Sequence, residues 1–267
     1  MRWERKLALS DKIKIDQRGV PIPSAVTHSS ALDYHQIEID IDCQANSEPL
    51  VPVSDFALKH RSAYAHSLAP YYKTFDKAHQ IPHLRKGVAA RLAKVNETLK
   101  DYGVELLIMD GYRPVALQQE LWDHFIDMTH NKFPDKSEEE LVKFVGQYWS
   151  DPRSFDPNDY RTWPTHNTGG AVDLTLQDIK TGQDLYMGGV FDDVDEISST
   201  RHYEDERMLS LSAREARQNR RLLFHCMSHV GFANYHHEWW HFDYGTQMAI
   251  MNGFPEAKAF YGRATMD

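Results

Sequence analysis

The stretch HNTGGAVDLTL (residues 166–176) decides the fold, because a strand and two candidate metal ligands meet in it. Its second half, AVDLTL (171–176), alternates aliphatic and polar residues as a strand does. A charge inside an apolar strand is costly unless it is paired or bound to metal, so Asp173 is a candidate ligand. Two consecutive glycines permit a tight turn that brings His166 back toward Asp173. Taken alone, Asp173 would more simply cap a turn or pair with an arginine.

A second stretch, HHEWWH (236–241), holds the remaining candidate groups. It contains His-Glu-x-x-His, which in zincins lies on a helix. The surrounding aromatic residues are poor helix formers, and no glycine-bearing continuation with a third ligand follows, so we expect strands over 231–245 instead. The alternative uses only Glu238 and His241. Because residues three apart on a regular strand face opposite sides, it requires a bend at Trp239 and Trp240.

These residues together predict a catalytic zinc site. His166, Asp173 and His241 supply three ligands for one Zn²⁺ per chain and leave the fourth tetrahedral position open for water. Zinc lowers the pKa of such a water toward about 7. Glu238 is then expected to take the proton and pass it to the leaving amine.

Arg113 is a further catalytic candidate. It lies in DGYRP (110–114), directly after the apolar run VELLIM (104–109), which we expect to be a buried strand. The planar guanidinium is suited to stabilising a developing oxyanion. For an arginine considered by itself, a structural salt bridge is the simpler alternative.

The remaining pattern predicts an α+β fold. We expect helices over about 84–99 and 114–129, and two more that open with capping boxes at Ser137 and Ser212, the second running to Gly231. The run HQIEIDID (35–42) has the period of a half-buried strand. We therefore expect a single domain over 1–267, with a mainly antiparallel sheet flanked by helices. Residues 1–83 form an N-terminal extension packed on a motif-bearing core, 84–245.

Composition restricts the partners. The formal net charge of −9 disfavours nucleic acid and anionic membranes and fits a small or cationic ligand. Cys43 and Cys226 have no metal-binding spacing. The first 16 residues contain no apolar run long enough for a signal peptide, so we expect a cytoplasmic protein, or a periplasmic one if a leader has been removed.

The ordered motifs resemble a known family. DGYRP (110–114), HNTGGAVDLTL (166–176), MGGVFDD (187–193) and EWWHF (238–242) are similar to motifs of the D-alanyl-D-alanine dipeptidases of vancomycin resistance. That family belongs to the D,D-peptidases that share a fold with the hedgehog signalling domain. The resemblance covers roughly residues 84–245.

The resemblance implies roles for particular residues. His166, Asp173 and His241 would bind zinc, Glu238 would be the base and Arg113 the transition-state stabiliser. Asp192 would bind the free ammonium of the substrate, which restricts an enzyme to dipeptides.

The chain departs from the family in two places. Pro164 replaces a family serine that binds the substrate carboxylate, and Thr165 is the candidate substitute. A family tyrosine that helps to hold the ammonium corresponds to one of Tyr64, Tyr71 and Tyr72.

Three functions fit these observations. The first is a zinc dipeptidase acting on D-alanyl-D-alanine or similar short dipeptides. The second is a carboxypeptidase or endopeptidase of the same fold that acts on peptidoglycan stem peptides, which Asp192 disfavours because an ammonium-binding carboxylate closes the cleft to longer chains. The third is a non-enzymatic zinc-binding module, which would need neither Glu238 nor Arg113.

Overall fold

The computed structural model describes residues 17–24, 33–146, 148–193, 195–205 and 210–266, and a mixed sheet lies at its centre. The sheet order is β2-β4-β5-β7-β6. Strand β2 pairs in parallel with β4, and the other neighbours pair antiparallel, which confirms the α+β prediction. The strand bounds are Lys59–His60 (β2), Val104–Asp110 (β4), Ala171–Asp178 (β5), Ala233–Asn234 (β6) and His241–Asp243 (β7).

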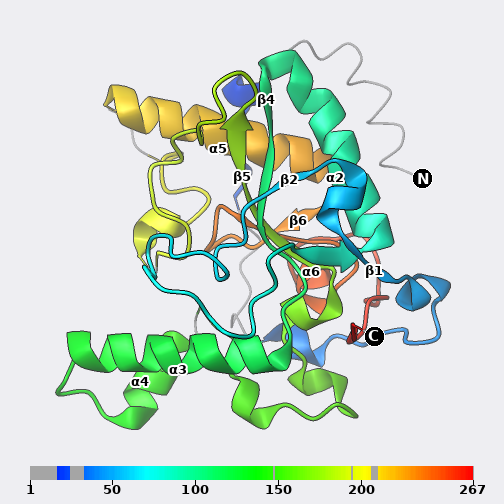
Figure 1. Ribbon diagram of the computed structural model, residues 1–267, viewed down its shortest axis with the longest axis vertical. Helices are drawn as coiled ribbons and strands as arrows, with labels where there is room; N and C mark the ends of the chain where they lie inside the picture. Colours follow the sequence, from blue (N-terminus) through cyan, green and yellow to red (C-terminus); the bar gives the residue numbers. More distant parts are fainter. Residues whose placement is uncertain (1–16, 25–32, 147, 194, 206–209, 267) are drawn as a thin grey trace.

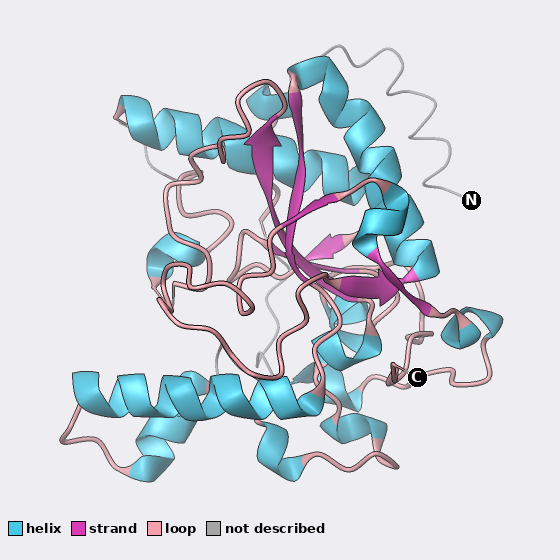
Figure 2. Cartoon of the chain, viewed as in Figure 1, coloured by secondary structure: helices cyan, strands magenta, loops and turns pink. Residues whose placement is uncertain are grey.

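Helices surround this sheet, and a second, two-stranded sheet lies beside it (Figures 1 and 2). Helices α2 and α5 pack against β4 and β5, while α3 packs with α4 at the other side of the molecule. The bounds are Lys86–Leu99 (α2), Val115–Lys132 (α3), Glu138–Val145 (α4), Leu211–His229 (α5) and Gln247–Met251 (α6), and Leu50–Pro52 (β1) pairs with His83–Arg85 (β3). None of the described helices is long and apolar enough to cross a membrane.

The register of β5 brings the candidate ligands together. Its aliphatic residues are fully buried and pair with those of β4, as in Leu174 opposite Ile108. A register shift at the end of β4 places Asp110 opposite Asp173. On the other side of β5, Asp173 pairs with His241 of β7. The central strand therefore carries one ligand and lies beside another.

The predicted strand over residues 35–42 is wrong. This segment begins with a 3-10 helix, Asp33–Gln36, and its one bridge joins Ile39 to Ala259. The amide of Gln247 donates to the carbonyls of His35 and Ile37, at 3.4 and 2.6 Å. Since a side chain and not a neighbouring strand meets these carbonyls, no ladder extends along the segment.

Two helix termini also differ from the prediction. Helix α5 is capped by Ser210, whose side chain accepts from the backbone N–H of Ala213, so Ser212 is not the cap. At its other end α5 stops at His229, before the predicted Gly231, whereas the capping box predicted at Ser137 is confirmed. The stretch 1–16, on which the leader prediction rests, lies outside the described residues.

Candidate active site

The three predicted ligands meet in one buried cluster. The ligand atoms of His166, Asp173 and His241 all lie within 4.8 Å of one another. Each of the three residues is at most 5% exposed, so the cluster is shielded from bulk water. Although burial opposes it, the two imidazoles hold the pKa of Asp173 well below its usual value. A charged carboxylate with two imidazole nitrogens is a donor set suited to a divalent transition metal.

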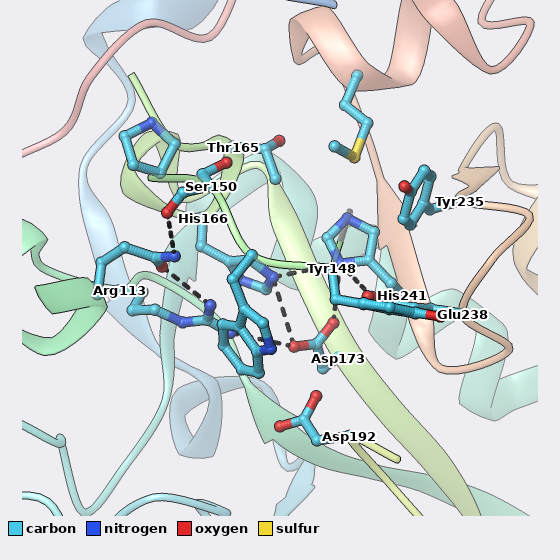
Figure 3. A pocket seen from close by; sticks show the side chains of 14 residues that line it. Arg113, Tyr148, Ser150, Thr165, His166, Asp173, Asp192, Tyr235, Glu238 and His241 are labelled. Carbon is cyan, nitrogen blue, oxygen red and sulfur yellow. Dashed lines mark hydrogen bonds and ion pairs between the residues drawn. The ribbon is translucent and has the colours of Figure 1, made fainter. Parts of the chain in front are cut away.

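Each histidine presents a different nitrogen to the cluster (Figure 3). His166 donates from Nδ1 to the carbonyl of Gly111 at 2.8 Å, which directs Nε2 inward. His241 donates from Nε2 to Asp243 at 2.7 Å, which directs Nδ1 inward. The inward-facing nitrogens are 3.2 Å apart. Both tautomers are thus set by a hydrogen bond on the outer side of the ring.

Glycine lets the DGYRP turn reach His166. A Cβ on Gly111 would lie 2.5 Å from the carbonyl oxygen of His83, so a larger residue would displace β3 from the turn. The two glycines after His166 are similarly confined, and Gly169 has a φ of +71°. The tight turn predicted between His166 and Asp173 is confirmed.

Glu238 lies at the edge of the cluster because the chain bends. Trp239 and Trp240 form a turn before β7 begins at His241. The bend predicted between Glu238 and His241 is therefore confirmed, and the helical zincin interpretation is excluded. The carboxylate of Glu238 is 3.8 Å from Nδ1 of His241. Burial raises the pKa of Glu238 to about 8, against the lowering influence of His241.

Arg113 lines the same pocket and is firmly held. Its guanidinium donates to Asp110 at 2.9 Å, to Gln118 at 3.0 Å and to the hydroxyl of Tyr64 at 2.9 Å. It also lies 3.4 Å from Asp173. The salt bridge that we considered as the alternative does exist, yet the guanidinium still borders the cavity beside the cluster.

Asp192 lies on another side of the pocket and accepts from two tyrosines. The hydroxyl of Tyr64 is 2.9 Å and that of Tyr71 is 2.6 Å from its Oδ2. Burial, reinforced by the charge of Asp173, raises the pKa of Asp192 to about 7. Of the three tyrosines suggested by the sequence, Tyr72 is the one that points away, since it is 75% exposed.

An arginine outside the pocket fixes the loop that carries Asp192. Arg220 of α5 is buried and donates to the carbonyls of Met187, Ile197 and Ser199, each at 2.7 Å. These carbonyls lie on both sides of Asp192 in the sequence. Asp192 has a φ of +58°, a left-handed conformation that aspartate tolerates better than most residues. The backbone on either side is therefore anchored.

Thr165 lines the pocket across the cluster from Asp192 (Figure 3). Its hydroxyl donates to Asp243 at 2.6 Å, so donation to a bound ligand would require this bond to be exchanged. Ser150, which the sequence analysis did not single out, lines the same side, and its hydroxyl is bonded to that of Tyr34 at 2.7 Å.

Comparisons with known proteins identify the family of the chain. The family model for Peptidase M15, D-ala-D-ala dipeptidase, matches residues 53–259. A D-alanyl-D-alanine dipeptidase of Synechocystis sp. is 32% identical over 223 residues, covering 78% of this chain and 86% of the relative. One of Streptomyces coelicolor is 32% identical, covering 59% of this chain and 70% of the relative. One of Enterococcus faecium is 33% identical, covering 58% and 69%.

A solved structure gives a weaker likeness. It is a mutant of the vancomycin resistance D,D-pentapeptidase VanY in complex with Zn(II), 12% identical, with a TM-score of 0.39 over 85% of this chain and 96% of that chain. The match to the family model and the Synechocystis relative establish the family without this structure. They exclude the non-enzymatic module, and the chain belongs to the Peptidase M15 family, D-ala-D-ala dipeptidase, as a metallopeptidase.

Proposed function

We propose that this protein is a zinc-dependent dipeptidase that hydrolyses D-alanyl-D-alanine or closely similar dipeptides with a free amino terminus. The observation that carries the proposal is one buried pocket lined by His166, Asp173, His241, Glu238 and Asp192. The names of the relatives support the same substrate class.

The residues fit zinc. Two imidazoles of fixed tautomer and one carboxylate make a three-ligand set, and catalytic zinc sites keep a fourth position open. When bound, zinc lowers the pKa of water and polarises the peptide carbonyl. With imidazole nitrogens from His166 and His241 and one carboxylate from Asp173 as ligands, a bound divalent ion would keep a net positive charge for this role.

Glu238 and Arg113 then share the remaining work. Glu238 accepts a proton from the attacking water and delivers it to the amine that leaves, and a pKa raised toward neutrality suits a group that must do both. Arg113 borders the pocket with a preorganised donor and stabilises the oxygen that becomes negative. Its bonds to Asp110 and Gln118 keep it oriented without substrate.

The two ends of the pocket determine the length of the substrate. Asp192 binds the ammonium group, and Tyr64 and Tyr71 direct its carboxylate toward the pocket. A peptide extended at its amino end would bury an amide against this carboxylate and lose the ion pair. Thr165 lies at the opposite end, where we place the substrate carboxylate.

The test is release of D-alanine from D-alanyl-D-alanine by purified protein loaded with zinc, with a chelated sample as the matched control. We expect release that is lost on chelation and restored by zinc. N-acetyl-D-alanyl-D-alanine should be cleaved poorly. Cleavage of the acetylated peptide or of a stem peptide at an equal or higher kcat/KM would instead support the carboxypeptidase alternative.

A further inference from the structure

A buried carboxylate behind the three metal-ligand candidates has no part in the chemistry described above. Asp243 lies two residues after His241 on β7, so both side chains project to the same side of the strand. Its side chain has no exposure to solvent. We propose that Asp243 is a positioning residue, which holds the His241 ring so that Nδ1 faces the metal and thereby sets the affinity for it.

The geometry assigns one role to each nitrogen of His241. Nε2 is 2.7 Å from Oδ2 of Asp243. Nδ1 is 3.0 Å from Oδ1 of Asp173, inside the cluster. A metal held by His241 and Asp173 would replace the contact between Nδ1 and Asp173, and the ring proton would stay on Nε2, where the carboxylate of Asp243 accepts it. A carboxylate in this position also makes the ring a more basic ligand.

Asp243 is itself fixed from the opposite side. Its Oδ1 accepts from the hydroxyls of Thr165 at 2.6 Å and Thr246 at 2.7 Å. Thr246 also caps α6, because its side chain accepts from the backbone N–H of Ala249 at 3.0 Å. Two hydroxyls from different parts of the chain therefore prevent the carboxylate from rotating away from His241.

The charge environment points to the same role. Among the ion pairs of the described residues, Asp243 takes part in the one with His241, and neither lysine nor arginine is its partner there. A buried carboxylate without a cation is costly. Metal binding at the far side of the imidazole supplies the compensating positive charge. The equivalent hydrogen bond of His166 is to the neutral carbonyl of Gly111 at 2.8 Å, and the carboxylate of Asp110 lies farther from the same nitrogen, at 3.6 Å, so the two histidines are unequal ligands.

Asp243→Asn is the first test, because asparagine keeps the shape but removes the charge and can present an N–H₂ group to His241. We expect zinc affinity, measured by competition with a chromogenic chelator, to fall about 10- to 100-fold, the usual effect of losing such a contact. The spectrum of the cobalt-substituted protein should change as well. Asp178→Asn, at the distant end of β5, is the matched control and should leave both unchanged.

Thr246→Val is a milder variant that removes one of the two hydroxyl donors, and we expect a smaller loss of affinity in the same direction. A merely structural Asp243 would lower the melting temperature of the metal-free variants without changing zinc affinity, and that result would overturn the inference. The measurement needs no turnover. A zinc-binding protein that cleaves no dipeptide would refute the proposed function, while the affinity comparison would still decide the role of Asp243.

Discussion

Two buried aspartates beside the metal cluster have opposite environments. Asp192 lies in a loop with a left-handed φ of +58°, accepts from two tyrosine hydroxyls and forms no ion pair among the described residues. Asp243 lies on a strand, accepts from two threonine hydroxyls and is paired with His241. Each carboxylate is oriented by two hydroxyl groups. They differ in what else they face: Asp243 is bonded to the ring of His241, whereas Asp192 lines the pocket.

This difference suits Asp192 to binding a ligand and Asp243 to holding His241 in place. The charge of Asp192 faces the pocket and is unbalanced, so its pKa is raised to about 7 by burial. A cationic ligand would remove that cost. Asp243 is fully buried, bonded to His241 and two threonines, and does not line the pocket. In the roles we propose, the same type of side chain binds substrate at position 192 and supports a metal ligand at position 243.

The largest loss of activity should come from a change at Glu238, which lies outside this comparison of two aspartates. We expect Glu238→Ala to retain zinc and to lose about 10²- to 10⁴-fold in kcat, the contribution of a general acid–base group. Zinc content and kcat are measured on the same preparation. Undiminished kcat, or loss of zinc, would contradict the assigned role.

The next largest effect should separate the two aspartates. Asp192→Asn removes the charge that binds the ammonium, and loss of one partner from a buried ion pair costs about 2–5 kcal/mol. We expect kcat/KM for D-alanyl-D-alanine to fall about 30- to 5000-fold with zinc affinity unchanged. Asp243→Asn should show the opposite pattern, in which the affinity for zinc falls. If Asp192→Asn kept its preference for the free over the N-acetylated dipeptide, the comparison would fail.

The unbalanced charge of Asp192 should also appear in the pH dependence of stability. Its pKa is about 7 in the folded protein, above its usual value of 3.8, so between these pH values the folded state holds a proton that the unfolded chain has lost. The free energy of unfolding of the metal-free protein therefore falls as pH rises through this range, by about 1.4 kcal/mol for each pKa unit. Asp192→Asn removes this contribution.

Urea unfolding of the metal-free wild type and of Asp192→Asn at pH 5 and pH 8 isolates that contribution, because the other titrating groups are common to both proteins. We expect the variant to lose less stability between the two pH values. An identical loss in both proteins would show that the Asp192 carboxyl titrates normally.

The smallest loss of activity should come from the removal of one hydroxyl group. Tyr71→Phe removes a single donor to Asp192, a bond worth about 1 kcal/mol, and we expect kcat/KM to fall roughly 3- to 10-fold. Tyr72→Phe is the matched control, since Tyr72 is exposed and lies next in the sequence. Equal effects of the two substitutions would remove Tyr71 from the site.

The sequence predicted the groups that local spacing constrains. The turn between His166 and Asp173 needs only two glycines, and the bend before His241 follows from strand periodicity. The sequence did not show which of the three tyrosines contacts Asp192, because Tyr64 and Asp192 are 128 residues apart in the chain. Asp243 left a local signal that was missed, since it stands one strand period after His241.

The strand predicted at 35–42 was wrong for a related reason. Its alternation of isoleucines is that of a strand, but a strand also needs a partner with free backbone groups. Here a glutamine amide meets the carbonyls instead. The alternation of apolar residues shows that a segment could form a strand, but it does not show whether the folded chain offers a partner strand.

The origin of the two tyrosines has an evolutionary consequence. Tyr64 and Tyr71 come from the part of the chain before residue 84, whereas the metal cluster, Glu238 and Arg113 all come after it. The two hydroxyls that orient Asp192 thus come from a different part of the chain from the groups proposed for catalysis. Substitutions before residue 84 can therefore alter the orientation of Asp192 without touching the metal-ligand candidates, so substrate preference and hydrolysis can change separately.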